Sequence, residues 1–328
     1  MMIGYHASHE QFAPAALLEL AHRAEHAGFD ALMCSDHFHP WTSAQGQSGH
    51  SWVWSGALAA QCALTLGMVT CPMLRQHPAL VAQAAATLDQ LAPGRVWLAL
   101  GTGEALNERI TGKPWLSKEM RQQALLEAAD VMRRLWQGER VDHTGAFELR
   151  SARLYSRPLL PLPLLGAAVT EASARWVGSW ADGLITISQP LPVLRRVVNA
   201  FEAAGGLGKP MYVQAKLSYA RSEEAALAGA LQQWSANVLP PELAEGLDQP
   251  EQFEACAAKV DALQLREHVH VSADLQRHLA WLQQLQSLGF DRIYLHNVNL
   301  EQERFIDDFA AHVLPPLRRH SAPPTSHA

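Results

Sequence analysis

The stretch LTLGMVTCPMLRQHPALVAQAAATLDQLAPGRVWLAL, residues 64–100, contains the pattern that decides the fold. It begins and ends with two short apolar runs, Leu64–Val69 and Val96–Leu100, which suit buried strands. Between them, Ala79–Leu91 has apolar residues at helical spacing, and the turn Pro93–Gly94 closes this segment. A strand, a helix and a second strand in this order form the βαβ unit of a parallel sheet.

The same alternation continues along the chain in both directions. Further apolar runs are Ile3–Tyr5, Ala31–Cys34, Leu164–Ala168, Gly183–Ile187, Tyr212–Leu217 and Arg292–His296. Further helical patterns are Pro14–Ala27 (ending at Gly28), Lys118–Gln137, Glu171–Trp180, Leu191–Ala204, Leu275–Leu288 and Glu301–Leu314. Strands that are apolar throughout are typical of a parallel sheet covered on both faces. Eight such units favour an α/β protein with a closed (β/α)₈ TIM barrel over an open doubly wound sheet.

Two segments interrupt this alternation. Residues 138–163 contain a predicted hairpin of Val141–His143 and Phe147–Leu149, and residues 240–270 form a long excursion before the last βα unit. We expect both to be insertions on barrel loops, so that residues 1–320 form one domain. The low-complexity tail 321–328 is expected to be disordered.

Composition excludes several classes of function. The chain has 26 Lys and Arg against 32 Asp and Glu, so no basic field indicates nucleic acid or an anionic membrane as a partner. The four cysteines show no CxxC pairing, which argues against a zinc site or a disulfide framework and suits a reducing cytoplasm. The first residues do not resemble a cleavable signal, and no apolar run approaches the ~20 residues of a membrane span.

Barrel enzymes carry their active sites at the C-terminal ends of the strands, so the residues after each apolar run are the candidates. After Ala31–Cys34 comes SDHFHPW, residues 35–41, which includes Asp36, His37 and Trp41. Imidazole titrates near neutrality, so His37 is a candidate for exchanging protons with a substrate. The alternative is that Asp36 and His37 only brace the loop.

After Val96–Leu100 comes GTGEALNE, residues 101–108. Glycines in the turn Gly101, Thr102, Gly103 allow the backbone to approach a flat ligand closely. Glu104 is a candidate acid or hydrogen-bond acceptor. The turn is not a dinucleotide fingerprint, because Leu106 stands where the third glycine belongs.

A third candidate site follows Leu164–Ala168. Here Ala167, Ala168, Val169 and Thr170 lead into a helix whose free N–H groups can hold a phosphate. The alternative is that Thr170 is a plain N-cap. Glu171 would lie unfavourably close to such a phosphate.

Four motifs together, GYHASHEQFAP, CSDHFHPW, VTCP…R…HPA…AQAAATL and LALGTGEALNERITG, resemble the luciferase-like monooxygenase family. They are most similar to its branch of deazaflavin-dependent glucose-6-phosphate dehydrogenases. The resemblance implies a luciferase-like barrel over residues 1–320, a homodimer, and a flavin or deazaflavin ring at the C-terminal mouth. It implies that Asp36, His37 and Trp41 contact the ring and handle protons. It also implies that Glu104 and Asn107 are the acid and the amide of the family's GTGEALNE motif.

The resemblance also implies a bulge with a non-prolyl cis peptide at Met68–Val69, placed against the ring. The sequence departs from the branch at two positions. Val169 and Thr170 replace a glycine pair that receives the coenzyme phosphate, and residues 188–191 lack the lysine expected for the substrate phosphate. These departures make glucose 6-phosphate doubtful as the substrate. They favour FMN as the cofactor, with coenzyme F420 as the alternative.

The sequence therefore predicts a flavin-dependent oxidoreductase of a small organic substrate, with His37 and Glu104 as its catalytic residues. In a dehydrogenase version, His37 takes a proton from the substrate while a hydride moves to the ring. In a monooxygenase version, reduced FMN reacts with oxygen, and a flavin reductase is an expected partner. The rival hypothesis is a flavin-binding protein without catalysis.

Overall fold

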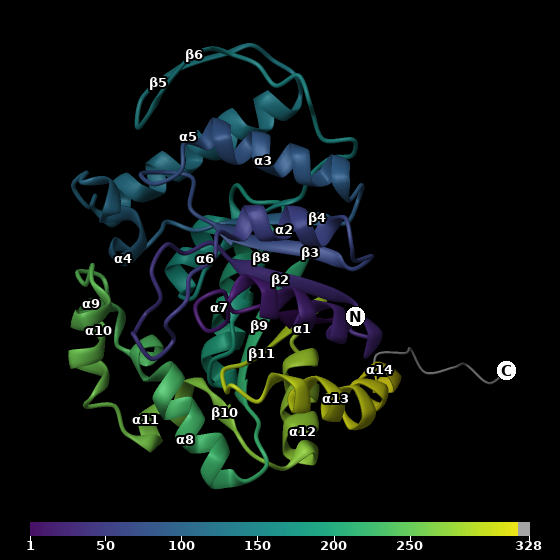
Figure 1. The fold of residues 1–328 in the computed structure, drawn as a ribbon. Helices are drawn as coiled ribbons and strands as arrows, with labels where there is room; N and C mark the ends of the chain where they lie inside the picture. Colours follow the sequence, from purple (N-terminus) through teal and green to yellow (C-terminus); the bar gives the residue numbers. More distant parts are fainter. Residues whose placement is uncertain (321–328) are drawn as a thin grey trace, which may run out of the picture.

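The computed structural model describes residues 1–320, in which eight parallel strands close into a barrel (Figure 1). Each strand pairs with the next, β8 pairs with β9, and β11 returns to β1. This confirms the predicted (β/α)₈ fold, while the predicted tail 321–328 lies outside the described residues. The barrel strands are β1 (Met2–His6), β2 (Ala31–Ser35), β3 (Thr65–Thr70), β4 (Val96–Leu100), β7 (Leu164–Ala167), β8 (Leu184–Ile187), β9 (Met211–Ser218) and β11 (Arg292–Asn297).

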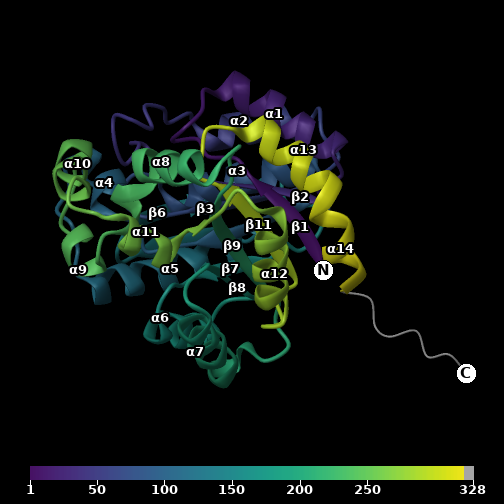
Figure 2. The ribbon, with the colours of Figure 1, turned by 90° about the horizontal axis from the view of Figure 1, so that it is seen from below.

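Helices surround the strands on all sides (Figure 2). Those predicted from periodicity are α1 (Pro14–His26), α3 (Pro78–Leu91), α5 (Lys118–Trp136), α6 (Glu171–Gly178), α7 (Leu191–Phe201), α12 (Leu275–Gln286) and α13 (Gln302–His312). Gly28 follows α1 with φ +90°, as its role at the helix end requires. Helices that were not predicted include α2 (Ser51–Ala59), α8 (Glu223–Trp234) and α14 (Leu314–His320).

Both predicted insertions are present. The hairpin consists of β5 (Val141–Thr144) and β6 (Glu148–Ala152), which pair in antiparallel fashion beyond α5 (Figure 1). The second insertion contains α9 (Pro241–Ala244), α10 (Pro250–Ala257), α11 (Ala262–His268) and the two-residue strand β10 (His270–Val271), which pairs with the end of β9. It lies on the side of the barrel where the strands end, because Phe253 of α10 packs with Leu106 of α4 (Ala105–Glu108) and with Trp41.

The interior of the barrel changes character from one end to the other. At the N-terminal end, Trp97, Tyr212 and Tyr294 fill the interior, and Trp97 Nε1 donates to Tyr294 Oη at 2.8 Å. This packing needs Gly67, because a Cβ there would lie 2.0 Å from the Trp97 ring. The C-terminal half of the interior is instead polar, with His6 and His296 stacked at 4.1 Å between ring centroids. The tightly packed N-terminal end of the barrel therefore contributes to stability, whereas a ligand can enter at the polar C-terminal end.

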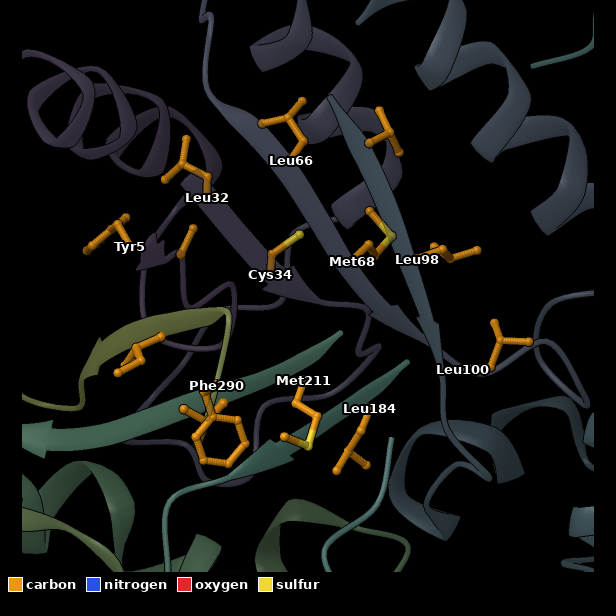
Figure 3. Close-up of a cluster of buried hydrophobic side chains, with 14 of the residues drawn as sticks. Tyr5, Leu32, Cys34, Leu66, Met68, Leu98, Leu100, Leu184, Met211 and Phe290 are labelled. Carbon is orange, nitrogen blue, oxygen red and sulfur yellow. The ribbon is translucent and has the colours of Figure 1, made fainter. Parts of the chain in front are cut away.

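The bulge and the cis peptide expected at Met68–Val69 are wrong in this structure. The peptide bonds of the described residues include no cis bond, and β3 pairs in continuous register with β2 and β4, so no bulge forms. Side chains alternate along a strand. Val69 accordingly faces the barrel interior, whereas Met68 lies in the outer core with Leu66 and Leu98 (Figure 3).

Candidate active site

A cavity of about 280 Å³ opens at the C-terminal ends of β2, β3, β4, β7 and β8. Its walls contain most of the residues selected from the sequence, although these come from four separate segments of the chain. The selected residues that line it are Asp36, His37, Val69, Gly101, Thr102, Gly103, Glu104, Asn107, Ala167, Ala168 and Val169. The strand-end rule thus selected residues that line one cavity.

Three selected residues do not line this cavity. Met68 points into the outer core, as described above. Trp41 packs edge-on against Phe253 and lies with its ring 6.0 Å from that of His37. Thr170 is the N-cap of α6, where its hydroxyl accepts from Ser173 N at 3.2 Å. The simple N-cap alternative describes what Thr170 does in this structure.

His37 is held by a carboxylate that sequence reasoning missed. Its Nδ1 lies 2.5 Å from Oε1 of the buried Glu10, which also accepts from Ser8 Oγ at 2.9 Å. Burial alone would lower the pKa of His37, but the Glu10 hydrogen bond and charge raise it above its ordinary value of 6.5. Burial would likewise raise the pKa of Glu10, and the contact with His37 lowers it instead. Within residues 1–320, Nε2 of His37 makes no hydrogen bond.

Glu104 lies across the mouth from His37. Its side chain is open to the mouth, and Asn107 Nδ2 donates to its Oε2 at 3.3 Å. Desolvation by the surrounding residues raises the pKa of Glu104, while the positive charges of His37 and Lys216 oppose that rise. Asn107 also fixes the His37 loop, because its Oδ1 accepts from the backbone N–H groups of Phe38 and His39 at 2.8 and 3.1 Å.

Asp36 has a different environment from His37, although the two are adjacent in sequence. Its carboxylate accepts from Thr70 Oγ1 at 2.8 Å and from Gln76 Nε2 at 2.5 Å, and it lies 3.1 Å from the guanidinium of Arg75. The same guanidinium lies 3.6 Å from the buried Glu108. Asp36 therefore braces the loops around the cavity, which is the alternative considered for it from the sequence.

One wall of the cavity suits a flat ligand. The neighbouring strands β4 and β7 form it with small residues, and Gly101 lies beside Ala167. Gly103 has φ +73°, and a Cβ there would lie 2.7 Å from Cys71 Sγ. A larger residue at this turn would strain the backbone and press on the cavity wall. A glycine is therefore needed at Gly103 for two independent reasons.

Sequence reasoning missed Glu10, Arg75, Glu108 and Lys216. Glu10 follows the first apolar run, so the rule of examining strand ends could have found it. Lys216 is a single charged residue inside the predicted strand Tyr212–Leu217, which is a signal in itself. Nothing along the chain marks Arg75 as the partner of Asp36.

Residues 1–320 offer neither a metal site nor a membrane-spanning helix. No cluster of three or more His, Cys, Asp or Glu side chains there could hold a metal ion. No helix in that part of the chain has the length and apolarity needed to cross a membrane.

The chain is similar to known proteins over nearly its whole length. The family model for luciferase-like monooxygenases matches residues 1–292. The chain is 35% identical over 329 residues to a protein of Beutenbergia cavernae named F420-dependent glucose-6-phosphate dehydrogenase, covering 97% of this chain and 98% of that protein. It is 36% identical over 333 residues to a protein of the same name from Intrasporangium calvum, covering 97% and 99%.

Among solved structures, an F420-dependent secondary alcohol dehydrogenase in complex with an F420–acetone adduct is similar, with a TM-score of 0.89 and 30% identity. The match covers 97% of this chain and 99% of that one. A coenzyme F420-dependent tetrahydromethanopterin reductase from Methanopyrus kandleri matches with a TM-score of 0.77 at 18% identity, which shows the shared fold alone.

Proposed function

The chain belongs to the luciferase-like monooxygenase family as a flavin-type oxidoreductase, and we propose that it is a coenzyme F420-dependent dehydrogenase of a small hydroxy compound. The observation that carries the proposal is the contact of His37 with Glu10. It leaves the second imidazole nitrogen free of protein partners in a wall of the cavity. A group in this setting is suited to take a proton from a hydroxyl. The names of the similar proteins favour coenzyme F420 over the FMN expected from the sequence.

The residues present fit a deazaflavin ring. The cavity is near the lower end of the range for small-molecule sites, about 300–1,000 Å³. The small residues Gly101 and Ala167, side by side on the neighbouring strands β4 and β7, leave room for a flat ring against this wall, and Thr186 and Gln214 supply polar edges. When bound there, the deazaflavin would accept a hydride from the carbon that bears the substrate hydroxyl.

The protein groups supply the proton chemistry. Neutral His37 takes the hydroxyl proton at Nε2 as the carbon loses its hydride, so the alcohol becomes a carbonyl compound. Glu10 holds the ring in place through Nδ1 and stabilises the imidazolium that forms, as a buried carboxylate does in other acid–base pairs. Glu104 adds a second negative charge at the mouth, which also favours protonated His37.

One feature of the site keeps FMN as a second candidate. At the end of β7, Val169 carries a side chain that is 42% exposed, and its carbonyl accepts from Gln189 Nε2 at 3.0 Å. Because Thr170 already caps α6, this corner offers fewer free donors to a long phosphate tail than a glycine pair would. A shorter FMN tail is less affected by these side chains.

The test is a direct titration. Isothermal calorimetry of the purified protein with coenzyme F420 and with FMN should show tighter binding of coenzyme F420. The loaded protein should then reduce the coenzyme when a hydroxy compound is supplied, measured as loss of deazaflavin absorbance. Tighter FMN binding, together with oxygen consumption in place of coenzyme reduction, would replace the proposal with the monooxygenase version.

A further inference from the structure

Lys216 lies near the C-terminal end of β9, in the wall of the barrel at its mouth. It follows Gln214 by two residues in β9, and alternate side chains of a strand point to the same face. Gln214 lines the cavity, so Lys216 points into the barrel nearer its open end. Its register partner on β11 is His296.

The ammonium group of Lys216 has no ion pair and no side-chain hydrogen bond within residues 1–320. Its Nζ lies 5.3 Å from the centroid of the Trp234 ring. The carboxylates that act on it electrostatically are Glu104 and Glu10. Both already have partners, because Glu10 binds His37 and Ser8, and Glu104 accepts from Asn107. Three N–H donors therefore remain available at the mouth.

An unpaired, half-buried ammonium group destabilises the folded protein unless another group forms hydrogen bonds with it. A half-buried lysine that serves only packing normally extends its ammonium into bulk solvent. Here burial lowers the pKa of Lys216 to about 8, although the two carboxylates oppose the change. The adjacent side chains are uncharged, because Trp234 is apolar and burial lowers the pKa of His296 well below its ordinary 6.5. A ligand that reaches this wall meets the Lys216 charge.

We propose that Lys216 is a specificity-determining residue that donates hydrogen bonds to an anionic oxygen of the substrate. The preferred substrates are then hydroxy compounds that carry a carboxylate or a phosphate, with the hydroxyl at His37 and the anion at Lys216. The proposal rests on the dehydrogenase function above for the hydroxyl end alone. Charged hydrogen bonds of this kind are roughly twice as strong as neutral ones, so they discriminate between otherwise similar substrates.

The experiment compares matched neutral and anionic alcohols: 2-butanol with 3-hydroxybutanoate, and glycerol with glycerol 3-phosphate. Coenzyme-loaded wild type should have the higher kcat/KM for one or both anionic partners, and the two pairs separate carboxylate from phosphate. Lys216→Met should lower that kcat/KM about 10- to 100-fold, mainly through KM, and leave the neutral alcohol within about threefold. Lys118→Met, which removes one exposed charge at the start of α5, is the matched control. An equal loss for both partners, or no loss for the anionic one, overturns the proposal.

A binding measurement gives an answer even without turnover. Each anionic alcohol at millimolar concentration should raise the thermal unfolding midpoint of wild type and of Lys118→Met, but not that of Lys216→Met. Lys216→Gln replaces it if the Met variant does not fold. Absence of any anion effect on wild type, or an equal effect on the Lys216 variant, contradicts the role of Lys216. Failure to bind coenzyme F420 contradicts the proposed function instead, and the titration detects this separately.

Discussion

Two groups of charged side chains lie close together at the mouth of the barrel. They differ in how many of their polar atoms form hydrogen bonds or ion pairs with other protein groups. Asp36 and Glu108 share the buried Arg75 and take further hydrogen bonds from side chains or backbone N–H groups. His37 and Glu104 instead each keep polar atoms directed at open space. Satisfied groups hold the walls in place, and groups with free donors or acceptors can act on a ligand. Adjacent residues such as Asp36 and His37 can therefore have opposite roles.

The largest effect should come from the open group. His37→Ala removes the proton acceptor, and turnover should fall by about 10²–10⁴ while flavin or deazaflavin affinity stays within roughly tenfold. His39→Ala is the matched control, since its ring does not line the cavity: Nδ1 lies 2.9 Å from the Leu106 carbonyl oxygen, and the ring packs edge-on against Phe38. Steady-state kinetics and coenzyme titration measure both quantities. Normal turnover by His37→Ala would reduce His37 to a bracing residue like Asp36.

The next largest effect should come from the paired group of Asp36, Glu108 and Arg75, and it should change the stability of the protein. Arg75→Met leaves Asp36 and Glu108 buried without their counter-charge, which should lower the free energy of unfolding by about 3–5 kcal/mol. Arg150→Met, at a side chain that is 89% exposed, should change it by less than about 0.5 kcal/mol. Urea unfolding measures the difference. A small loss for Arg75→Met would mean that the two carboxylates do not depend on the guanidinium.

A smaller effect concerns the pH profile. Glu10 raises the pKa of His37, and the proton acceptor must be neutral, so alcohol oxidation in wild type should increase with pH well above 6.5. Glu10→Gln removes the negative charge, the pKa of His37 falls, and the rising limb of kcat/KM should move to lower pH by about one unit or more. A profile that does not move would show that Glu10 has no electrostatic influence on the reaction.

The smallest effect separates capping from cofactor contact at Thr170. Thr170→Ala removes the N-cap of α6 and should cost about 1 kcal/mol of stability, with coenzyme affinity unchanged within about threefold. Ser117→Ala, the corresponding change at the N-cap of α5, should cost a similar amount. If coenzyme affinity drops sharply for Thr170→Ala alone, Thr170 belongs with the ligand-binding groups.

The predictability of the fold came from patterns that repeat locally. Apolar runs of strand length, helical spacing and turns such as Pro93–Gly94 are short-range signals, and eight of them in sequence leave little choice of architecture. The exceptions have physical causes. In α2, SWVWSGALA has no apolar stripe, because its buried face includes Ser51 and Ser55 while the apolar Val53 is exposed on the opposite side. In α8, alanine and glycine supply small contacts without a strong period.

The sequence by itself determined the order of the strands and the residues that follow them, which placed His37, Glu104 and Asn107 at one mouth. Only the tertiary structure decided which of these groups are satisfied. Glu10 reaches His37 across 27 residues, and Arg75 reaches Asp36 across 39. A hydrogen bond depends on atoms within about 3 Å of each other, and no periodicity along the chain specifies that distance. The parallel pairing of β1 with β2 and of β2 with β3 sets it, because this pairing brings the ends of the three strands together.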